Sequence, residues 1–289
     1  MSSKNTINYS IYSGAGNDFV MINNLDNIIP FGDQAAFTKK ICETQFPKLD
    51  GVIFLERPQD GNNSIRMNYY NRDGSYGAMC GNGARCIAQY AVDNNVLDKT
   101  EFNLEAVNKV YKAQILNNNV VKIYFPPPDS YRLNLKIEKV NGLNTVTGYY
   151  MLVGSDHLVI FIKDDSNRDI FNSSSLDEIN IELWGSVLRY HPDFAPAGAN
   201  VNFADVFPPH ELRIRTFERG VERETLACGT GIISSAVISS LLKKVSPPIK
   251  VLSQSGEWLT VDFNLSGDKI SNLSLEGPAK KIGDGEIEL

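Results

Sequence analysis

The sequence predicts an α+β fold of two pseudo-symmetric domains, each a curled, mainly antiparallel and barrel-like β-sheet around one central helix. Three observations predict it. The chain repeats a pattern of strand, polar connector, cysteine turn and apolar helix; the second of these helices, at 231–242, is apolar on most sides; and a run of prolines lies between the two copies. Because such helices are buried inside their domains, the strands of each domain must surround them.

Length and composition are those of an ordinary globular protein. The chain has 289 residues, of which 42% are hydrophobic and 21% charged, with a formal net charge of −6. This length favours two domains over one. Lysine and arginine are not clustered, which argues against a nucleic-acid partner. No apolar stretch approaches the roughly 20 residues of a membrane span, and the N-terminus lacks the apolar core of a signal peptide, so we expect a cytoplasmic protein with no membrane partner.

The first half begins with residues 7–11, which alternate in hydrophobicity as strands do and run into a glycine loop at 13–19. A helix is predicted at 33–44 because Pro47 follows it closely. The remaining elements of this half are strands at 52–55, 65–70, 102–116 and 120–125 and a helix at 84–92.

The clearest break in the chain is the proline run at 126–128. Consecutive prolines cannot join a helix interior or a central strand, so we place a domain boundary there. The predicted domains are 1–127 together with 273–289, which carry Cys80, and 128–272, which carry Cys228.

The second half is expected to repeat this alternation of strands and helices. Its helices are predicted at 178–188 and 231–243, the second ending before two prolines. Its strands are predicted at 149–153, 158–162, 199–203, 212–217, 249–252, 258–263 and 270–276.

The internal repeat is the strongest signal in the chain. In the first copy a strand at 65–70 leads to Cys80-Gly81-Asn82-Gly83; in the second a strand at 212–217 leads to Cys228-Gly229-Thr230-Gly231. An arginine near the start of each strand lies 14 residues before the first cysteine and 15 before the second. So long a period excludes a solenoid and indicates two similar domains that face each other.

The four cysteines of the chain do not form a disulfide framework. Cys42 and Cys86 lie within predicted helices and are interpreted as small buried core residues. Cys80 and Cys228 each stand at the start of a helix, where free N–H groups and the helix dipole are expected to lower the pKa of a thiol. The three histidines are too scattered to suggest a metal site.

Two thiols facing each other across a cleft between the domains suit one reaction, the transfer of an α-proton from one face of an amino acid to the other. One thiolate takes the proton and the opposite thiol returns one. The substrate carboxylate would lie between the two helix N-termini, where charge developing on an enediolate-like species is stabilised. The backbone N–H groups expected to hold it belong to Gly81, Asn82, Gly229 and Thr230.

Several alternatives stay open at this stage. Taken singly, Cys80 or Cys228 is as readily an inert thiol as a functional one. His157 alone is interpreted as an ordinary structural histidine, and Glu218 with Arg219 as a solvated salt bridge. Asparagines next to glycine loops usually serve the backbone; those concerned are Asn17, Asn71 and Asn200. The rival functions are a cofactor-free racemase for another amino acid and a redox switch in which the two cysteines form a disulfide. A pyridoxal enzyme is disfavoured because the repeat supplies acid and base itself, so no cofactor is expected.

The motifs together resemble the diaminopimelate epimerase family, in order and across nearly the whole chain. The matching segments are 13–19, 71–75, 80–86, 198–203, 218–220 and 224–231. The resemblance implies a cofactor-independent interconversion of LL- and meso-diaminopimelate, which feeds lysine and peptidoglycan synthesis, by a homodimer.

The resemblance also implies roles for individual residues. Cys80 and Cys228 would be the acid/base pair, and His157 would tune the reacting centre. The catalytic set is Cys80, Cys228, His157 and Glu218. The substrate-binding set is Asn17, Asn71, Gly81, Asn82, Ser155, Asn200, Glu218, Arg219, Gly229 and Thr230, with Asn200, Glu218 and Arg219 at the distal amino-acid end.

The chain departs from the family pattern in two places. Where the family usually has Gly-Asn-Pro-His, this chain has Gly154-Ser155-Asp156-His157, so that Ser155 replaces a substrate-contacting asparagine and Asp156 adds a negative charge. The connector at 221–224 is one residue longer than the common form. Both departures bear on the specificity for the distal group more than on the proton chemistry.

Overall fold

The computed structural model describes residues 6–117, 119–140, 142 and 144–288. The chain divides into two compact units, Met1–Phe125 with Glu276–Leu289, and Pro126–Leu275. Cys80 belongs to the first unit and Cys228 to the second. The expected boundaries fell after residues 127 and 272; the units of the structure change after residues 125 and 275, the latter inside strand β16 (Lys269–Pro278).

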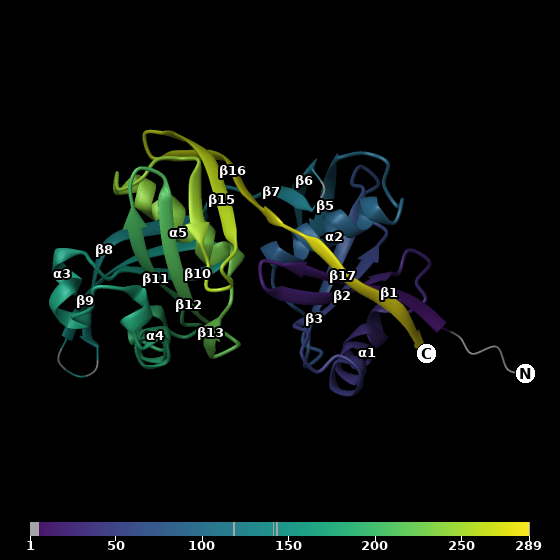
Figure 1. Cartoon of the computed structure of the whole chain (residues 1–289), viewed down its shortest axis with the longest axis horizontal. Helices are drawn as coiled ribbons and strands as arrows, with labels where there is room; N and C mark the ends of the chain where they lie inside the picture. Colours follow the sequence, from purple (N-terminus) through teal and green to yellow (C-terminus); the bar gives the residue numbers. More distant parts are fainter. Residues whose placement is uncertain (1–5, 118, 141, 143, 289) are drawn as a thin grey trace, which may run out of the picture. The chain divides into compact units, whose positions relative to one another are not determined.

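The first unit wraps its strands around helix α2. Its elements are β1 (Thr6–Gly14), β2 (Asn17–Asn23), α1 (Phe31–Thr44), β3 (Gly51–Glu56), β4 (Ile65–Asn71), α2 (Gly81–Asp93), β5 (Glu101–Ala106), β6 (Lys109–Asn117), β7 (Val120–Tyr124) and β17 (Lys280–Glu288). The strands pair in the order β17-β1-β2-β3-β4-β5-β6-β7. Helix α2 contacts both ends of this order, β17 and β7, as well as strands between them, so the sheet curls around it (Figure 1).

The second unit does the same around helix α5. Its elements are β8 (Ser130–Val140), β9 (Asn144–Val153), β10 (Ser155–Phe161), α3 (Asp165–Phe171), α4 (Ile181–Arg189), β11 (Asn200–Phe207), β12 (Glu211–Glu218), β13 (Arg223–Thr225), α5 (Gly229–Leu241), β14 (Ile249–Leu252), β15 (Trp258–Ser266) and most of β16. Helix α5 contacts β9, β10, β11, β12, β14 and β15, and Figure 1 shows it among these strands. Every described residue of α5 from Gly229 to Ser240 is buried, as an all-round apolar helix requires.

The two sheets repeat strand by strand. Among the strand pairs whose registers the structure describes, β2–β3 and β4–β5 of the first unit are parallel and its others antiparallel. In the second unit β10–β11 and β12–β14 are parallel. The register repeats too. Ile65 pairs with Leu104 in the first unit, and Leu212 pairs with Val251 in the second. Leu212 follows Ile65 by the same number of positions as Val251 follows Leu104. The predicted α+β fold, with a mainly antiparallel sheet curled around a central helix in each half, is confirmed.

Three predicted elements differ in detail. The strand expected at 102–116 is two strands, because Val107 and Asn108 adopt positive φ angles of 48° and 57° and reverse the chain. The helix expected at 178–188 begins only at Ile181, because Asn180 caps it by accepting a hydrogen bond from Leu183 N at 3.0 Å. The glycine loop at 13–19 is a two-residue hairpin turn between β1 and β2. In the part of the chain described, no helix is long and apolar enough to cross a membrane.

Candidate active site

The start of α2 is shaped by Cys80, which is its N-cap residue with an extended backbone (φ −98°, ψ 109°). Its Sγ accepts a hydrogen bond from Gly83 N at 3.3 Å, and so satisfies one of the N–H groups that a helix start leaves unpaired. A Cβ on Gly83 would stand 2.7 Å from Ile53 Cδ1, so this turn packs closely on β3. The predicted cysteine turn is therefore the first turn of the helix.

Asn82 connects this turn to the hairpin before it. Its Nδ2 donates to Asn17 Oδ1 at 2.6 Å, and its Oδ1 accepts from Arg85 Nη2 at 2.8 Å. Asn17 and Asn82, both predicted site residues, are thus brought together beside Cys80. Asn71 lies at the end of β4, where its Nδ2 donates to Ser75 Oγ at 3.0 Å and its backbone N–H to the Ser75 carbonyl at 2.9 Å.

The start of α5 repeats this geometry. Cys228 is the N-cap residue (φ −118°, ψ 110°) and is 8% exposed. Its Sγ lies 3.7 Å from Thr230 Oγ1. A Cβ on Gly231 would overlap Asn202 Oδ1 on β11, so glycine is needed for the helix to approach the sheet this closely.

His157 is fully buried behind Thr230. Its Nε2 lies 2.8 Å from Thr230 Oγ1 and 2.9 Å from Ser155 Oγ, and its Nδ1 lies 3.2 Å from Asn202 Nδ2. Asn202 is oriented by Thr216, whose hydroxyl donates to Oδ1 at 3.0 Å; its Nδ2 also donates to a backbone carbonyl. Nδ1 of His157 therefore accepts, which assigns the proton to Nε2.

Burial keeps this imidazole neutral. It lowers the pKa of His157 from its usual 6.5 to about 3, and the charge of Arg219 adds to the effect while Asp156 opposes it. A neutral Nε2–H can donate to Thr230 Oγ1, leaving that hydroxyl free to direct its own proton elsewhere. The structure thus makes His157 a fixed hydrogen-bond donor next to the Cys228 turn.

The lowered pKa of His157 predicts a specific pH dependence of stability. Between pH 6.5 and about 3 the unfolded chain binds a proton at this site that the folded chain does not, so stability falls as pH falls through that window. We expect His157 to contribute a loss of about 1.5 kcal/mol in the free energy of unfolding between pH 6.5 and 5. Urea titrations at both pH values should show this loss in the wild type and a correspondingly smaller one in His157→Gln; equal losses in the two proteins would refute the assignment.

The predicted distal residues form a second group in the same unit. Arg219 Nη1 donates to Asp156 Oδ2 at 2.8 Å, and Arg219 N donates to Asn200 Oδ1 at 2.9 Å. Asn200 Nδ2 donates to Ser155 Oγ at 3.2 Å. Tyr150 donates to the other oxygen of Asp156 at 2.6 Å. Burial alone raises the pKa of Asp156, but the hydrogen bonds from Tyr150 and Arg219 outweigh it and leave the pKa below its usual range.

The salt bridge of Arg219 differs from the one that the sequence suggested. Its carboxylate partner is Asp156, whereas Glu218 accepts a hydrogen bond from Thr225 Oγ1 at 2.8 Å. Asp156, one of the departures from the family pattern, therefore holds the guanidinium in place. Ser155, which belongs to the same departure, touches both His157 and Asn200 and links the two groups.

Two residues of this site were not singled out in the sequence. Asn202 lies two positions after Asn200, hence on the same side of the strand, inside a motif that had been recognised. Arg85 lies inside the Cys80 motif. The other two cysteines are core residues as predicted: burial raises the pKa of the Cys42 thiol and of the Cys86 thiol.

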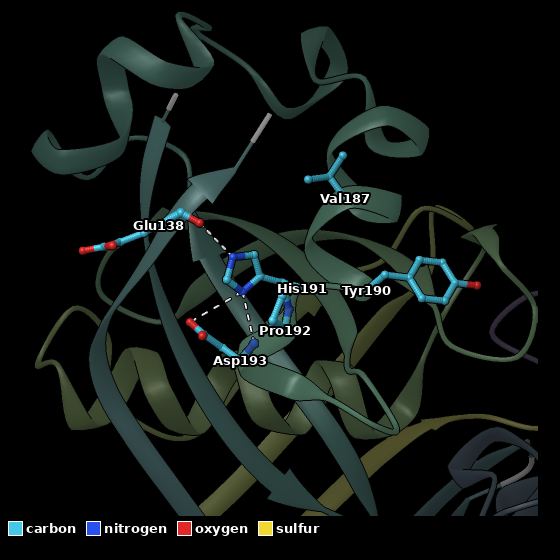
Figure 2. Close-up of a pocket in the computed structure, with 6 residues that line it drawn as sticks. All are labelled: Glu138, Val187, Tyr190, His191, Pro192 and Asp193. Atoms are coloured by element: carbon cyan, nitrogen blue, oxygen red, sulfur yellow. Dashed lines mark hydrogen bonds and ion pairs between the residues drawn. The ribbon is translucent and has the colours of Figure 1, made fainter. Parts of the chain in front are cut away.

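A surface pocket of the second unit lies apart from these residues. Figure 2 shows its lining, Glu138, Val187, Tyr190, His191, Pro192 and Asp193. His191 Nε2 donates to the backbone carbonyl of Glu138 at 2.8 Å, and Nδ1 accepts from Asp193 N at 3.3 Å. The ring is thus engaged in holding two backbone segments together. The pocket contains none of the predicted site residues.

Comparison with known proteins supports the resemblance noted in the sequence. The family model of diaminopimelate epimerase matches residues 9–127 and 149–282. Proteins named diaminopimelate epimerase are 35% identical in Hydrogenobaculum sp. (strain Y04AAS1), over 96% of both chains, and 35% identical in Chlorobaculum tepidum, over 96% of this chain and 100% of the relative.

Solved structures share the fold at low sequence identity. A PhzF-family phenazine biosynthesis protein from Bacillus anthracis superposes with a TM-score of 0.73 and 14% identity, over 99% of this chain and 100% of that one. A hydroxyproline epimerase from Agrobacterium vitis superposes with a TM-score of 0.69 and 16% identity, over 100% and 94%. These likenesses concern the fold, whereas the family model and the relatives at 35% identity span nearly the full chain. The chain belongs to the diaminopimelate epimerase family and is an amino-acid epimerase, an isomerase.

Proposed function

We propose that this protein converts LL-2,6-diaminopimelate to meso-diaminopimelate with two thiols and no cofactor. Cys80 and Cys228 act on opposite faces of one α-carbon, as base and acid in one direction and with roles exchanged in the other. The observation that carries the proposal is the repeated geometry: each cysteine is the N-cap of the buried central helix of its unit, at the same place in a repeated fold. The chemistry requires both units to serve one substrate.

The proton transfer balances within this pair. A thiolate at one sulfur takes the α-proton and becomes a thiol, while the thiol opposite donates its proton to the other face and becomes a thiolate. The carboxylate next to the α-carbon carries the negative charge in between. The N–H groups of Gly81, Asn82, Gly229 and Thr230, at the positive ends of two helices, would stabilise that charge.

The distal amino-acid end of the substrate would lie against the Arg219 group. Arg219, fixed by Asp156, offers positive charge to a carboxylate, and Glu218 with Asn200 offers acceptors to an ammonium group. Ser155 takes the place of the asparagine usual in the family, and Asn17 and Asn71 would contact the substrate from the first unit. Such a site suits a substrate with a second zwitterionic end.

The biological setting follows from the same proposal. The product would serve lysine synthesis and peptidoglycan precursors in the cytoplasm, and the protein would act as a homodimer on a small amino-acid substrate without nucleic-acid or membrane partners. The support is the membership of the family and the names of the relatives.

A substrate panel tests the proposal, with LL-diaminopimelate compared with lysine, histidine and glutamate. We expect diaminopimelate to be preferred at least about 100-fold in kcat/KM, because lysine and histidine lack the distal carboxylate and glutamate lacks the distal ammonium, and each leaves charged site groups unpaired. Equal turnover of lysine would indicate a related racemase of other specificity. An α-proton that never exchanges, together with reversible formation of a disulfide between Cys80 and Cys228, would indicate a redox switch.

Glu218→Gln tests the distal assignment. The change keeps size and one hydrogen-bond acceptor but removes the charge, so we expect kcat/KM for diaminopimelate to fall about 10- to 100-fold, equivalent to about 1.4–2.7 kcal/mol. The free energy of unfolding should change by less than about 1 kcal/mol. Glu211→Gln, the same change at the exposed start of β12, is the matched control and should leave both quantities unchanged. An unaltered kcat/KM in Glu218→Gln would remove this residue from the site.

A further inference from the structure

The two cysteine turns have different surroundings, although they occupy equivalent places in the repeat. A Cβ on Gly83 would meet Ile53 of β3, and a Cβ on Gly231 would meet Asn202 of β11, so Ile53 and Asn202 are equivalent. Across the parallel pairs β2–β3 and β10–β11, these two residues pair with Met21 and Val159. The equivalence therefore relates an apolar side chain in the first unit to a polar one in the second.

The same register relates two further positions. Two residues before Met21 and Val159 stand Phe19 and His157, both buried. The wall behind the Cys80 turn is apolar, because Gly83 faces Ile53 and Met67 and Phe19 stands at the position equivalent to His157. The wall behind the Cys228 turn is made of His157 and Asn202, which are neutral hydrogen-bonding groups. The first unit lacks the polar relay of the second at these positions.

The first unit has a charge instead. Five residues after Cys80 stands Arg85, and five residues after Cys228 stands Ile233. Arg85 is fully buried, with 0% exposure. Its guanidinium donates to three neutral oxygens: the Gly81 carbonyl at 3.3 Å, Asn82 Oδ1 at 2.8 Å and the Pro278 carbonyl at 3.3 Å.

A buried cation without an anionic partner is costly. Within residues 6–117, 119–140, 142 and 144–288, no carboxylate makes an ion pair with Arg85. Burial lowers the pKa of Arg85 to about 10, and interaction with Cys86 and Cys80 opposes this lowering. The guanidinium therefore stays charged at neutral pH, beside the first turn of α2, and an anion there would balance it.

The other titratable groups near this turn do not supply that anion. Cys86 and Tyr12 stay neutral because burial raises the pKa of each well above its usual range. Asp18 of β2 also faces Cys86, but it is only half-buried, so solvent screens its charge more than that of Arg85. Cys80 is the remaining group of this turn that can become an anion.

We propose that Arg85 is a positioning residue that acts electrostatically through Cys80 and holds it as the resting thiolate, while Cys228 rests as the thiol. This inference rests on the proposed two-thiol function and deepens it. Arg85 acts both directly, through its charge, and through Asn82, whose amide oxygen it holds while the amide nitrogen donates to Asn17. The free enzyme would therefore be ready for the reaction direction in which Cys80 is the base and Cys228 the acid.

The test is the rate of alkylation by iodoacetamide at each cysteine of the reduced full-length protein between pH 5 and 10, followed by peptide mass spectrometry without substrate. In the wild type we expect Cys80 to react at least 10-fold faster than Cys228 at pH 7. In Arg85→Gln, the pH midpoint for Cys80 should rise by at least one unit and its rate at pH 7 should fall at least 10-fold. The plateau rate at high pH and the profile of Cys228 should not change.

Arg85→Lys, which keeps the charge, should bring the rate at Cys80 to within about threefold of the wild type. If Arg85 only supported the helix, Arg85→Gln would change the pH midpoints of both cysteines or the plateau rate. Arg85→Lys would then not restore the rate at Cys80. A Cys80 midpoint unaltered by Arg85→Gln would overturn the proposal. If the variants do not fold, the wild type decides alone: Cys80 reacting no faster than Cys228 at pH 7 overturns it. The alkylation experiment contains no substrate, so it tests the thiolate assignment separately from the proposed function. If Cys80 reacts faster than Cys228 but the protein does not turn over diaminopimelate, the proposed function is refuted and the thiolate assignment stands.

Discussion

Replacing either Cys80 or Cys228 with alanine is expected to lower kcat/KM for epimerisation by at least about 10³-fold. Each variant keeps one sulfur and loses either the base or the acid in a given direction, and general acid–base groups contribute about 10²- to 10⁴-fold each. The free energy of unfolding should fall by no more than about 1 kcal/mol, because only one sulfur atom is removed from a helix cap. Initial rates in both reaction directions and urea unfolding measure the two quantities.

Cys42→Ala is the matched control for these variants. Cys42 is also a buried cysteine in a helix of the first unit, but it belongs to the core. Its replacement should cost about 1–2 kcal/mol of stability through the cavity it leaves and should keep kcat/KM within about threefold. Substantial activity in Cys80→Ala or in Cys228→Ala would contradict the pairing of the two thiols as acid and base.

Gly231→Ala should damage both the stability of the second unit and its cysteine turn. The new Cβ would overlap Asn202 Oδ1, and Asn202 cannot turn away, because hydrogen bonds to Thr216, Leu158 and His157 fix its amide. The start of α5 must therefore shift. We expect a loss of about 2–3 kcal/mol in the free energy of unfolding and about 10²-fold in kcat, because displacement by about 1 Å is enough to misalign a reacting group.

Gly83→Ala is the control at the equivalent place in the first unit. There the new Cβ would meet Ile53 Cδ1 at 2.7 Å, the far end of a flexible side chain that can move. The strain should be nearly offset by the better helix propensity of alanine, about 1 kcal/mol, so stability should change by less than about 1 kcal/mol. If Gly231→Ala proves no more destabilising than Gly83→Ala, Asn202 is not the rigid support described above.

The repeat, both cysteine turns and the central helices could be predicted because they rest on local patterns. Glycines, apolar residues and cysteine recur in the same order, and helix ends follow from capping chemistry close in sequence. The predicted helix starts were late, at Ala84 and Gly231 against Gly81 and Gly229 in the structure. The glycines that suggested turns lie within the first helical turn, which packs closely on β3 in the first unit and on β11 in the second.

Other elements depend on partners far away in the chain. β17 (Lys280–Glu288) contains two glycines and several charges and reads poorly as a strand, yet it pairs with β1 at the opposite end of the sequence. α3 (Asp165–Phe171) has only seven residues and gave no helix signal, whereas β8 (Ser130–Val140) alternates apolar and polar residues as strands do and was missed all the same. Strand pairing of this kind is decided by neighbours on the sheet more than by intrinsic propensity.

The electrostatic partners of the site were hidden for the same reason. Arg219 and Asp156 are 63 positions apart, so the sequence suggested Glu218 as the nearer partner. Arginine is almost never fully buried without a partner, so the sequence does not predict that Arg85 is buried. Residue identity predicted what could react; only the fold shows which charges lie beside it.

The most direct test of the two-thiol mechanism is the isotope content of the first product formed in D₂O from protiated LL-diaminopimelate. The acid thiol carries a deuteron from solvent, while the base thiol keeps the proton it removed. In the first few per cent of turnover, meso-diaminopimelate should therefore contain deuterium at the inverted α-carbon and the remaining LL-diaminopimelate should contain none. Product that retains the proton of the substrate would show that a single base serves both faces, and would contradict the assignment of Cys80 and Cys228 as an acid/base pair.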